Sequence, residues 1–158
     1  MAPECYGETV HRTLAERGLA PLLHGTVCVA GAPLAIVMEY LDANCGWMTL
    51  QNYIKKHRDI TIDTEHPGLV RLLETMKTAR VVHGDLRPLN IMCLEKESGE
   101  LEIKVIDFDR AGSLGVARYP ACMNPDIPWP GKPRDLIGGD DDEKLLSRTL
   151  AKLYSCSD

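Results

Sequence analysis

The chain has 158 residues, of which 44% are hydrophobic and 26% charged, and it carries a formal net charge of −5. This length and balance are typical of one folded domain and exclude a disordered chain or two full domains. The acidic charge argues against nucleic acid or an anionic membrane surface as the main partner, and no apolar run reaches the ~20 residues of a membrane span.

The N-terminal part of the chain is predicted to hold one helix and one hairpin. Residues 7–17 show an apolar face at helical spacing, and Gly18 is a natural C-terminal stop. Two strand-like runs follow, at 25–30 and 34–40, with a Gly-Ala-Pro sequence between them. A tight turn there would pair the two runs as an antiparallel hairpin.

The middle of the chain alternates between helical and strand patterns. Helices are predicted at 48–57 and 67–80, and the second has a strongly apolar face. Two short strands are predicted at 91–94 and 101–106, joined by a turn at 97–100.

The C-terminal part begins with a long segment without periodicity. Residues 112–139 are rich in Pro and Gly, which favours an extended strap packed on the core. A final helix is predicted at 140–154, where an acidic run suits the positive end of the helix dipole.

The cysteines and the N-terminus indicate a reduced compartment. None of the six cysteines forms a C-x-x-C pair, so neither a zinc site nor a disulfide framework is favoured. The N-terminus lacks the basic and apolar regions of a secretory signal. We therefore expect a cytoplasmic protein, with the nucleus as an alternative and secretion excluded.

Three polar residues are expected to converge at one end of the second strand pair. The informative stretch is His83-Gly84-Asp85-Leu86-Arg87-Pro88-Leu89-Asn90, followed by Val105-Ile106-Asp107-Phe108-Asp109. Asn90 begins one strand and Asp107 ends the other, so a hairpin brings them together near Asp85. Amide and carboxylate oxygens suit Mg²⁺, which also binds phosphate oxygens. Asp85 is left to accept a proton from an attacking hydroxyl, as in a phosphoryl-transfer site.

These residues resemble the catalytic and metal-binding loops of the protein-kinase-like superfamily. His83-Gly84-Asp85 stands where protein kinases have H-R-D, and Asp107-Phe108-Asp109 stands where they have D-F-G. Both differences from the protein-kinase motifs resemble sequences of the aminoglycoside and choline phosphotransferase branch, and also sequences of divergent fungal-type protein-kinase-like families. The stretch from Tyr119-Pro120 to Trp129-Pro130 fits the Y-P-x-x-x-N-P-x-I-x-W-P pattern of the fungal group, which makes that group the preferred relative.

The resemblance implies roles for individual residues in this chain. Asp85 would be the catalytic base, Arg87 a cation for the transferred phosphate, and Asn90 and Asp107 the ligands of Mg²⁺. One of the acidic residues at 140–142 would brace the catalytic loop, with Asp141 the preferred choice.

The same resemblance implies an ATP site in the first 41 residues. Met38 would be the gatekeeper, and the backbone of Glu39 and Leu41 would bond the purine edge. Glu8 is the nearest candidate for the glutamate that pairs with a lysine over the phosphates, with Glu4 and Glu16 as alternatives.

The resemblance implies an α+β, protein-kinase-like fold in two parts. Residues 1–41 would be a partial N-lobe, with one helix, a β-hairpin and the hinge, and residues 42–158 a mainly helical C-lobe. A hairpin in a partial N-lobe would have an open edge, which favours self-association.

The function implied is ATP- and Mg²⁺-dependent phosphoryl transfer to a Ser or Thr hydroxyl of a protein. No G-x-G-x-x-G loop and no V-A-I-K-like strand occur in the sequence, so the transfer is expected to be weakened. The alternatives are an inactive pseudokinase that binds a protein partner, a small-molecule phosphotransferase of the aminoglycoside or choline kinase type, and an incomplete version of a longer protein.

Overall fold

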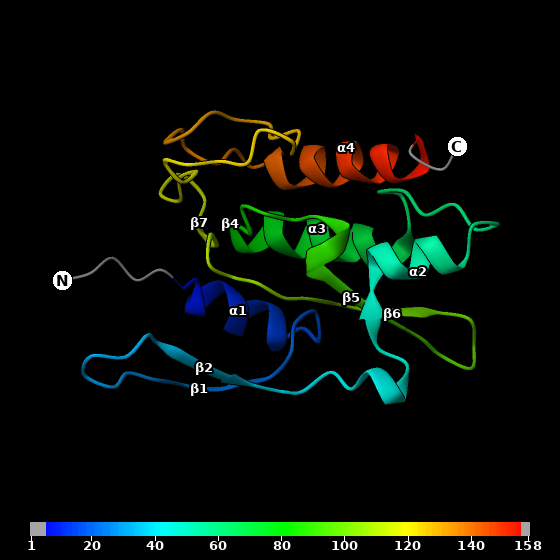
Figure 1. The fold of residues 1–158 in the computed structure, drawn as a ribbon, viewed down its shortest axis with the longest axis horizontal. Coiled ribbons are helices and arrows are strands. Elements are labelled where there is room, and N and C mark those ends of the chain that lie inside the picture. Colours follow the sequence, from blue (N-terminus) through cyan, green and yellow to red (C-terminus); the bar gives the residue numbers. More distant parts are fainter. Residues whose placement is uncertain (1–5, 156–158) are drawn as a thin grey trace.

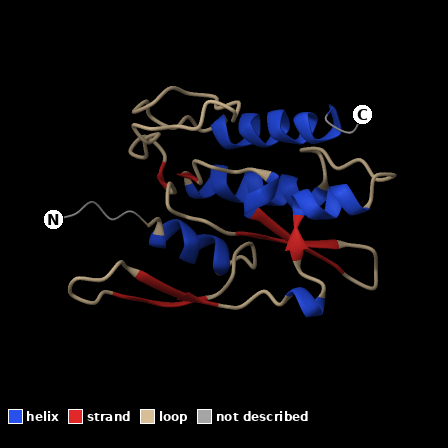
Figure 2. Ribbon diagram, viewed as in Figure 1, coloured by secondary structure: helices blue, strands red, loops and turns tan. Residues whose placement is uncertain are grey.

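The computed structural model describes residues 6–155, which form a mixed α+β fold of small sheets and helices (Figures 1 and 2). In the view of Figure 1, α4 lies along the top, α3 and α2 lie beneath it, and α1 and the β1–β2 hairpin lie at the bottom. The predicted α+β class is confirmed.

The first described elements are the predicted helix and hairpin. Helix α1 spans Glu8–Ala15 and buries Val10, His11 and Leu14. Strand β1 (Leu23–Val27) pairs antiparallel with β2 (Ala35–Met38) in a sheet of these two strands alone. Both strands are shorter at the turn end than predicted, because a seven-residue loop replaces the expected tight turn.

The second predicted helix begins two residues later than expected. Met48–Thr49 forms strand β3, which pairs with Cys93 and Met92, and α2 then spans Leu50–Lys56. The Thr49 hydroxyl accepts a hydrogen bond from Asn52 N at 3.2 Å, so Thr49 is the N-cap. The longer helix α3 spans Pro67–Ala79, in agreement with its predicted range.

A three-stranded sheet with the order β3-β5-β6 supports the site. Strands β5 (Ile91–Glu95) and β6 (Leu101–Val105) are the predicted pair, with Ile91 opposite Val105. Alternate residues of β5 are buried, which fixes this register because a slip of one residue would expose them.

The last part of the chain is irregular until the final helix, as predicted. An unpredicted ribbon joins β4 (Val81–Val82) to β7 (Gly112–Ser113), and a single bridge links Arg118 to Leu136. Helix α4 spans Asp141–Ser155 and packs Leu145, Leu146 and Leu150 inward. We call residues 118–138 the strap.

One main cluster of apolar side chains unites α1, α2, α3, α4 and the β5–β6 strands. Its fully buried members include Leu14, Leu50, Leu69, Phe108 and Leu146. The cluster runs beneath the loops that carry the polar motifs, so those loops rest on packed side chains. No helix within residues 6–155 is long and apolar enough to span a membrane.

Candidate functional site

The loop that carries Asp85 is held from below by a carboxylate of α4. Asp142 is buried and accepts hydrogen bonds from His83 N at 2.7 Å and Gly84 N at 2.9 Å. The prediction that Asp141 makes this contact is wrong. Asp141 instead accepts bonds from the Tyr119 hydroxyl at 3.1 Å and Gly138 N at 2.8 Å, because it faces the strap.

The environment of Asp142 combines two opposing effects on its charge. Burial raises the pKa of Asp142, while the hydrogen bonds from the backbone of His83, Gly84 and Leu86 act to lower it. A buried carboxylate that accepts backbone N–H groups rigidifies the loop that donates them. Asp142 therefore fixes the position from which Asp85 projects.

His83 links the Asp85 loop to the loop of Asp107. Its Nδ1 accepts from Asp85 N at 3.3 Å and its Nε2 lies 3.1 Å from the Ile106 carbonyl. The two partners assign the neutral tautomer with the proton on Nε2. The ring also contacts Phe108 edge-on, with centroids 5.3 Å apart. His83 is thus a structural connector between the two loops.

Phe108 continues this connection to α1. Its fully buried ring stacks on His11 with centroids 4.4 Å apart and planes 6° apart. His11 Nε2 lies 2.7 Å from the carbonyl of Pro21. Burial lowers the pKa of His11, so the ring is neutral near pH 7. The loop of Asp107 is therefore packed directly against the first helix.

Asn90 and Asp107 lie at the same end of the β5–β6 strands, as predicted. The Asn90 carbonyl accepts from Ile106 N at 3.0 Å, next to Asp107 in the chain. Asn90 Nδ2 donates to the Asp85 carbonyl at 3.0 Å, which assigns the amide orientation and leaves Oδ1 as the atom that could bind a metal. Asp107 is exposed and adopts a left-handed φ of 68°.

Asp109 adds a second carboxylate beside Asp107. Burial and the charge of Asp107 raise the pKa of Asp109, and Arg110 opposes this. Within residues 6–155 no group of three or more His, Cys, Asp or Glu side chains could hold a metal ion. Asn90 and Asp107 fit Mg²⁺, which takes few protein oxygens and completes its shell with water and phosphate.

Asp85 is buried and is flanked by two arginines. Arg87 bonds both of its carboxylate oxygens, through Nε to Oδ1 and through Nη2 to Oδ2 at 3.0 Å. Arg110 Nη1 lies 3.3 Å from the same Oδ2. The prediction placed Arg87 beside the transferred phosphate. In the structure Arg87 pairs with Asp85, two residues earlier in the chain.

Sequence reasoning missed Arg110 and assigned Trp129 only to a packed strap. The indole of Trp129 lies over both guanidiniums, with the Arg87 carbon 5.8 Å and the Arg110 carbon 4.9 Å from the ring centroid. Arg110 directly follows the Asp107-Phe108-Asp109 motif, which was the available signal. The strap has no sequence periodicity, so nothing in the sequence indicated that Trp129 contacts the two arginines beside Asp85.

The backbone conformation and the close packing at position 84 require the glycine that precedes Asp85. Its φ is +79°, and a Cβ at this position would lie 2.9 Å from the Arg110 carbonyl and 2.8 Å from Ile137 Cδ1. A left-handed conformation costs a residue with a Cβ about 1–2 kcal/mol, and the backbone clash adds to this. The glycine thus lets Arg110 approach the Asp85 loop.

We expect Gly84→Ala to lower the free energy of unfolding by at least about 2 kcal/mol, from the left-handed backbone and the clash together. Chemical denaturation with urea measures this change. Gly99→Ala is the matched control, because Gly99 also has a positive φ, +82°, but no atom lies within 4 Å of its added Cβ. Equal losses in the two variants would contradict the close approach of Arg110.

A cavity lies at the predicted ATP site. It has a volume of about 440 Å³ and is lined by residues of four segments: Pro21, Ile36, Val37, Met38, Glu39, Tyr40, Leu41, Met92 and Ile106. The predicted residues Met38, Glu39 and Leu41 are therefore brought together. Sequence reasoning missed Met92 and Ile106, which border the cavity from β5 and from the residue before Asp107.

The wall of this cavity is tied to the β5–β6 strands by an ion pair. Lys104 Nζ donates to both carboxylate oxygens of Glu39, at 2.8 and 2.9 Å, and lies 5.2 Å from the Trp47 ring centroid. The Lys104 hydrogen bond, with a further bond from Leu22 N, lowers the pKa of Glu39. The Glu39 carboxylate is thus engaged by Lys104 and Leu22 N, so a ligand in the cavity would contact the Glu39 backbone instead.

Glu8 lies in the first turn of α1 and its carboxylate has local partners. It pairs with Arg12 at 2.8 Å and accepts from the Thr26 hydroxyl at 3.4 Å. No lysine pairs with Glu8 within the described residues. Of the alternatives, Glu16 is the exposed C-cap of α1 and Glu4 lies outside the described residues. The nucleotide role of Glu8 stays a prediction.

Comparison with a solved structure places this arrangement in a known fold. The kinase PK-1 of the Cydia pomonella granulovirus matches 98% of the chain with a TM-score of 0.58 and 15% sequence identity. The chain covers 57% of that viral protein. The similarity shows that the fold is kinase-like.

Relatives by sequence are also kinases. Homeodomain-interacting protein kinase 4 of Mus musculus and that of Rattus norvegicus are each 30% identical over 84 residues. The matched segment is 53% of this chain and 14% of either relative, so the chain matches a small part of those proteins.

A family model supplies the assignment. Residues 31–118, more than half of the chain, match the model described as the lipopolysaccharide kinase (Kdo/WaaP) family. The match spans β2, the catalytic loop and the Asp107 loop. The finer resemblance to fungal-type kinases stays a prediction. The chain therefore belongs to the lipopolysaccharide kinase (Kdo/WaaP) family, within the protein-kinase-like superfamily.

Proposed function

We propose that the chain supports ATP- and Mg²⁺-dependent phosphoryl transfer to a Ser or Thr hydroxyl of a protein. The observation that carries the proposal is the continuity of one site. Ile106 borders the cavity at Met38–Leu41, and the next residue is Asp107, whose loop is bonded to Asn90 and, through His83, to Asp85. A nucleotide base in the cavity would direct its phosphates toward these oxygens.

The hinge backbone supports the purine part of the proposal. The Glu39 carbonyl and the Leu41 N–H have no hydrogen-bond partner within residues 6–155, whereas Glu39 N donates to the Leu22 carbonyl at 2.8 Å. A free carbonyl and a free N–H two residues apart offer an acceptor and a donor to the edge of a purine. Apolar side chains at Met92 and Ile106 border the same cavity.

The Asp107 loop supports the metal part of the proposal. Asn90 Oδ1 and the Asp107 carboxylate are hard oxygen ligands at one end of the β5–β6 strands. Bound Mg²⁺ would neutralise the phosphates that lie between the cavity and Asp85. Asp85 would accept the proton of the attacking hydroxyl.

The proposal predicts nucleotide binding that depends on magnesium through Asp107. Millimolar ATP with Mg²⁺ is expected to raise the Tm of the wild-type chain, and Asp107→Ala is expected to remove the difference between ATP with and without Mg²⁺. A thermal-shift titration measures both effects. An unchanged Tm at millimolar ATP, or an unchanged magnesium dependence in Asp107→Ala, would count against the assignment.

Asp63→Ala is the matched control for this measurement. Asp63 is exposed in the loop before α3, where its carboxylate accepts from Glu65 N at 3.0 Å. Its removal changes the net charge by the same amount as Asp107→Ala without touching the site. The magnesium dependence of the control is expected to equal that of the wild type.

A small-molecule hydroxyl is the second candidate acceptor, and the description of the matched family as lipopolysaccharide kinases favours it. The relatives named as protein kinases favour the first candidate. A pseudokinase that binds nucleotide without transfer is distinguished from both by the Asp85 variant described below. Localisation in the cytoplasm or nucleus stays a prediction.

Self-association stays a prediction that the β1–β2 hairpin supports. Val27, Val29 and Leu34 have exposed fractions of 47%, 56% and 47%, and no third strand pairs with the hairpin among the described residues. An open edge with apolar side chains invites pairing with another chain.

A further inference from the structure

Both oxygens of the proposed base are occupied by the chain itself. Arg87 bonds Oδ1 and Oδ2 of Asp85, and Arg110 Nη1 lies 3.3 Å from Oδ2. Only 7% of the Asp85 side chain is exposed. A base must come within about 2.6–3.2 Å of the hydroxyl whose proton it takes. An acceptor hydroxyl therefore reaches Asp85 only after one guanidinium moves.

Arg110 is the guanidinium that is held less firmly. Its Nη1 is buried and makes no hydrogen bond, whereas Arg87 makes two to the same carboxylate. Arg110 also lines a cavity of about 940 Å³ between α1 and the segment after Asp109, so it has space to turn. A buried donor that has an ion-pair contact but no hydrogen bond is incompletely satisfied, so an anion that accepts a hydrogen bond from Nη1 compensates for the lost contact with Oδ2.

Trp129 gives Arg110 a surface on which to move. The indole lies over both guanidiniums and its Nε1 donates to the Asn124 carbonyl at 2.9 Å. Arg148 Nη1 lies 3.2 Å from the carbonyls of both Pro128 and Trp129, which pins the strap to α4. The ring is therefore a fixed plane beside Asp85.

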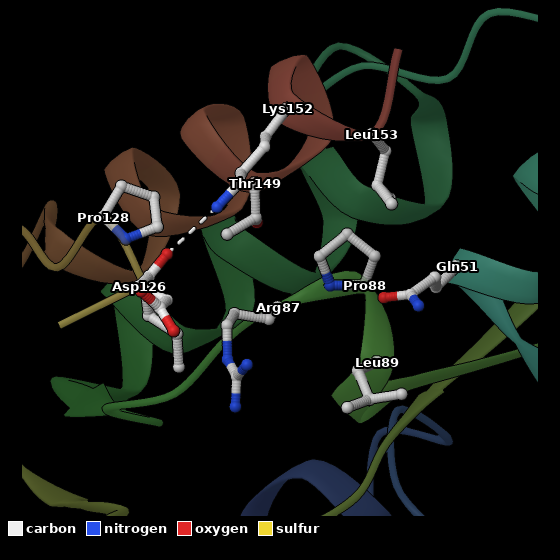
Figure 3. Close-up of a pocket in the computed structure, with 10 residues that line it drawn as sticks. Gln51, Arg87, Pro88, Leu89, Asp126, Pro128, Thr149, Lys152 and Leu153 are labelled. Carbon is white, nitrogen blue, oxygen red and sulfur yellow. Dashed lines mark hydrogen bonds between the residues drawn. The ribbon is translucent and has the colours of Figure 1, made fainter. Parts of the chain in front are cut away.

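A groove beyond Arg87 supplies a place for an extended polypeptide (Figure 3). It has a volume of about 230 Å³ between the catalytic loop, the strap and α4, and its apolar lining includes Leu89, Ile127 and Pro128. Arg87 and Lys152 line it as well, and Lys152 Nζ donates to the Asp126 carbonyl at 3.1 Å. This volume suits one or two side chains and is smaller than a typical small-molecule pocket of about 300–1,000 Å³.

We propose that Arg110 selects acceptor segments with a carboxylate next to the phosphorylated Ser or Thr. The inference rests on the proposed function and names its substrate class. The Glu or Asp of the acceptor takes Arg110 from Asp85 by a charge-assisted hydrogen bond, and this opens one side of Oδ2 to the hydroxyl while Arg87 keeps its hydrogen bonds to Oδ1 and Oδ2. The hydroxyl proton then passes to Asp85 as its oxygen bonds the terminal phosphorus of ATP and the bond to the departing ADP oxygen breaks.

The test measures peptide binding to the full chain by isothermal titration calorimetry. Three nine-residue peptides share a central Ser that is preceded by Leu, and differ only in the residue after Ser, which is Glu, Gln or phosphoserine. The Glu peptide is expected to bind about tenfold more tightly than the Gln peptide. In Arg110→Gln this ratio is expected to fall to about one.

Arg118→Gln is the matched control. Arg118 lines the same cavity as Arg110, but its Nη1 donates to the Arg134 carbonyl at 3.0 Å. The control is expected to keep the tenfold ratio. Equal binding of the Glu and Gln peptides to the wild type, or a preserved ratio in Arg110→Gln, overturns the proposal. A preference for phosphoserine over Glu overturns the choice of a carboxylate.

A second measurement needs no variant. On the wild type, the Glu-to-Gln ratio is expected to fall several-fold between 50 and 500 mM NaCl, because the Arg110 side chain as a whole is 31% exposed and salt screens a partly exposed charge pair; a ratio independent of salt contradicts a role of charge. Failure of the proposed function is read separately. If ATP gives no thermal shift while the wild type still prefers the Glu peptide, the proposed acceptor site is supported and the proposed phosphoryl transfer is contradicted.

Discussion

Asp85→Asn is expected to lower the rate of phosphoryl transfer by a factor of about 10²–10⁴, the usual contribution of a general base. The amide keeps the shape of the carboxylate but cannot take the hydroxyl proton. Binding of ATP with Mg²⁺ is expected to stay within about twofold, because the proposed metal ligands, Asn90 and Asp107, are unchanged in this variant. Transfer from radiolabelled ATP to dephosphorylated casein measures the rate, and calorimetry measures binding.

Asp59→Asn is the matched control for this change. It makes the same chemical substitution in an exposed turn after α2, outside the Asp85 and Asp107 loops. Its transfer rate is expected to equal that of the wild type. A rate for Asp85→Asn within threefold of the wild type would sink the assignment of Asp85 as the base. No transfer by either the wild type or Asp59→Asn would favour the pseudokinase alternative.

Asp142→Ala is expected to lower the free energy of unfolding by about 3 kcal/mol. The substitution leaves the buried N–H groups of His83 and Gly84 without acceptors, and each such orphan costs about 1–3 kcal/mol. Burial of the Asp142 charge, which raises its pKa, offsets part of this loss. At about 2–4 °C per kcal/mol for a domain of this size, the Tm is expected to fall by about 10 °C.

Asp140→Ala tests whether the loss of stability in Asp142→Ala comes from the hydrogen bonds to His83 and Gly84, and not from removal of a negative charge at the N-terminal end of α4. Asp140 has a side-chain exposed fraction of 69%, and its contact with Lys77 is 3.8 Å long. Its removal is expected to change stability by less than about 0.5 kcal/mol. If both variants lose equal stability, the hydrogen bonds to His83 and Gly84 do not carry the effect.

The long elements could be predicted because their periodicity is strong. Leu69, Leu72, Leu73 and Met76 recur at helical spacing and are all buried in α3. Strand β3 and the β4–β7 ribbon could not be predicted, because a two-residue strand has no periodicity of its own. Such strands form only where tertiary structure brings a partner alongside, as Met92 and Cys93 do for β3.

The site could be predicted where its residues belong to local motifs. Asn90 directly precedes β5 and Asp107 follows β6 by two residues, while Asp85 lies five residues before Asn90, so their approach follows from sequence order. The brace was missed by one residue, although a signal existed. Asp142 precedes Leu145 and Leu146 by three and four residues and shares their buried face. Trp129 could not be placed, because its position depends on bonds from α4 to an irregular segment.

The ion pair between Lys104 and Glu39 has a consequence for ligand affinity. It joins the wall of the hinge cavity to β6, and the Leu22 N–H bond to the same carboxylate at 3.0 Å adds a second tie. A binding site whose walls are already ordered loses little conformational entropy when a ligand arrives. A purine that bound here would meet a preorganised cavity, and most of its contact energy would appear as affinity instead of being spent on ordering the chain.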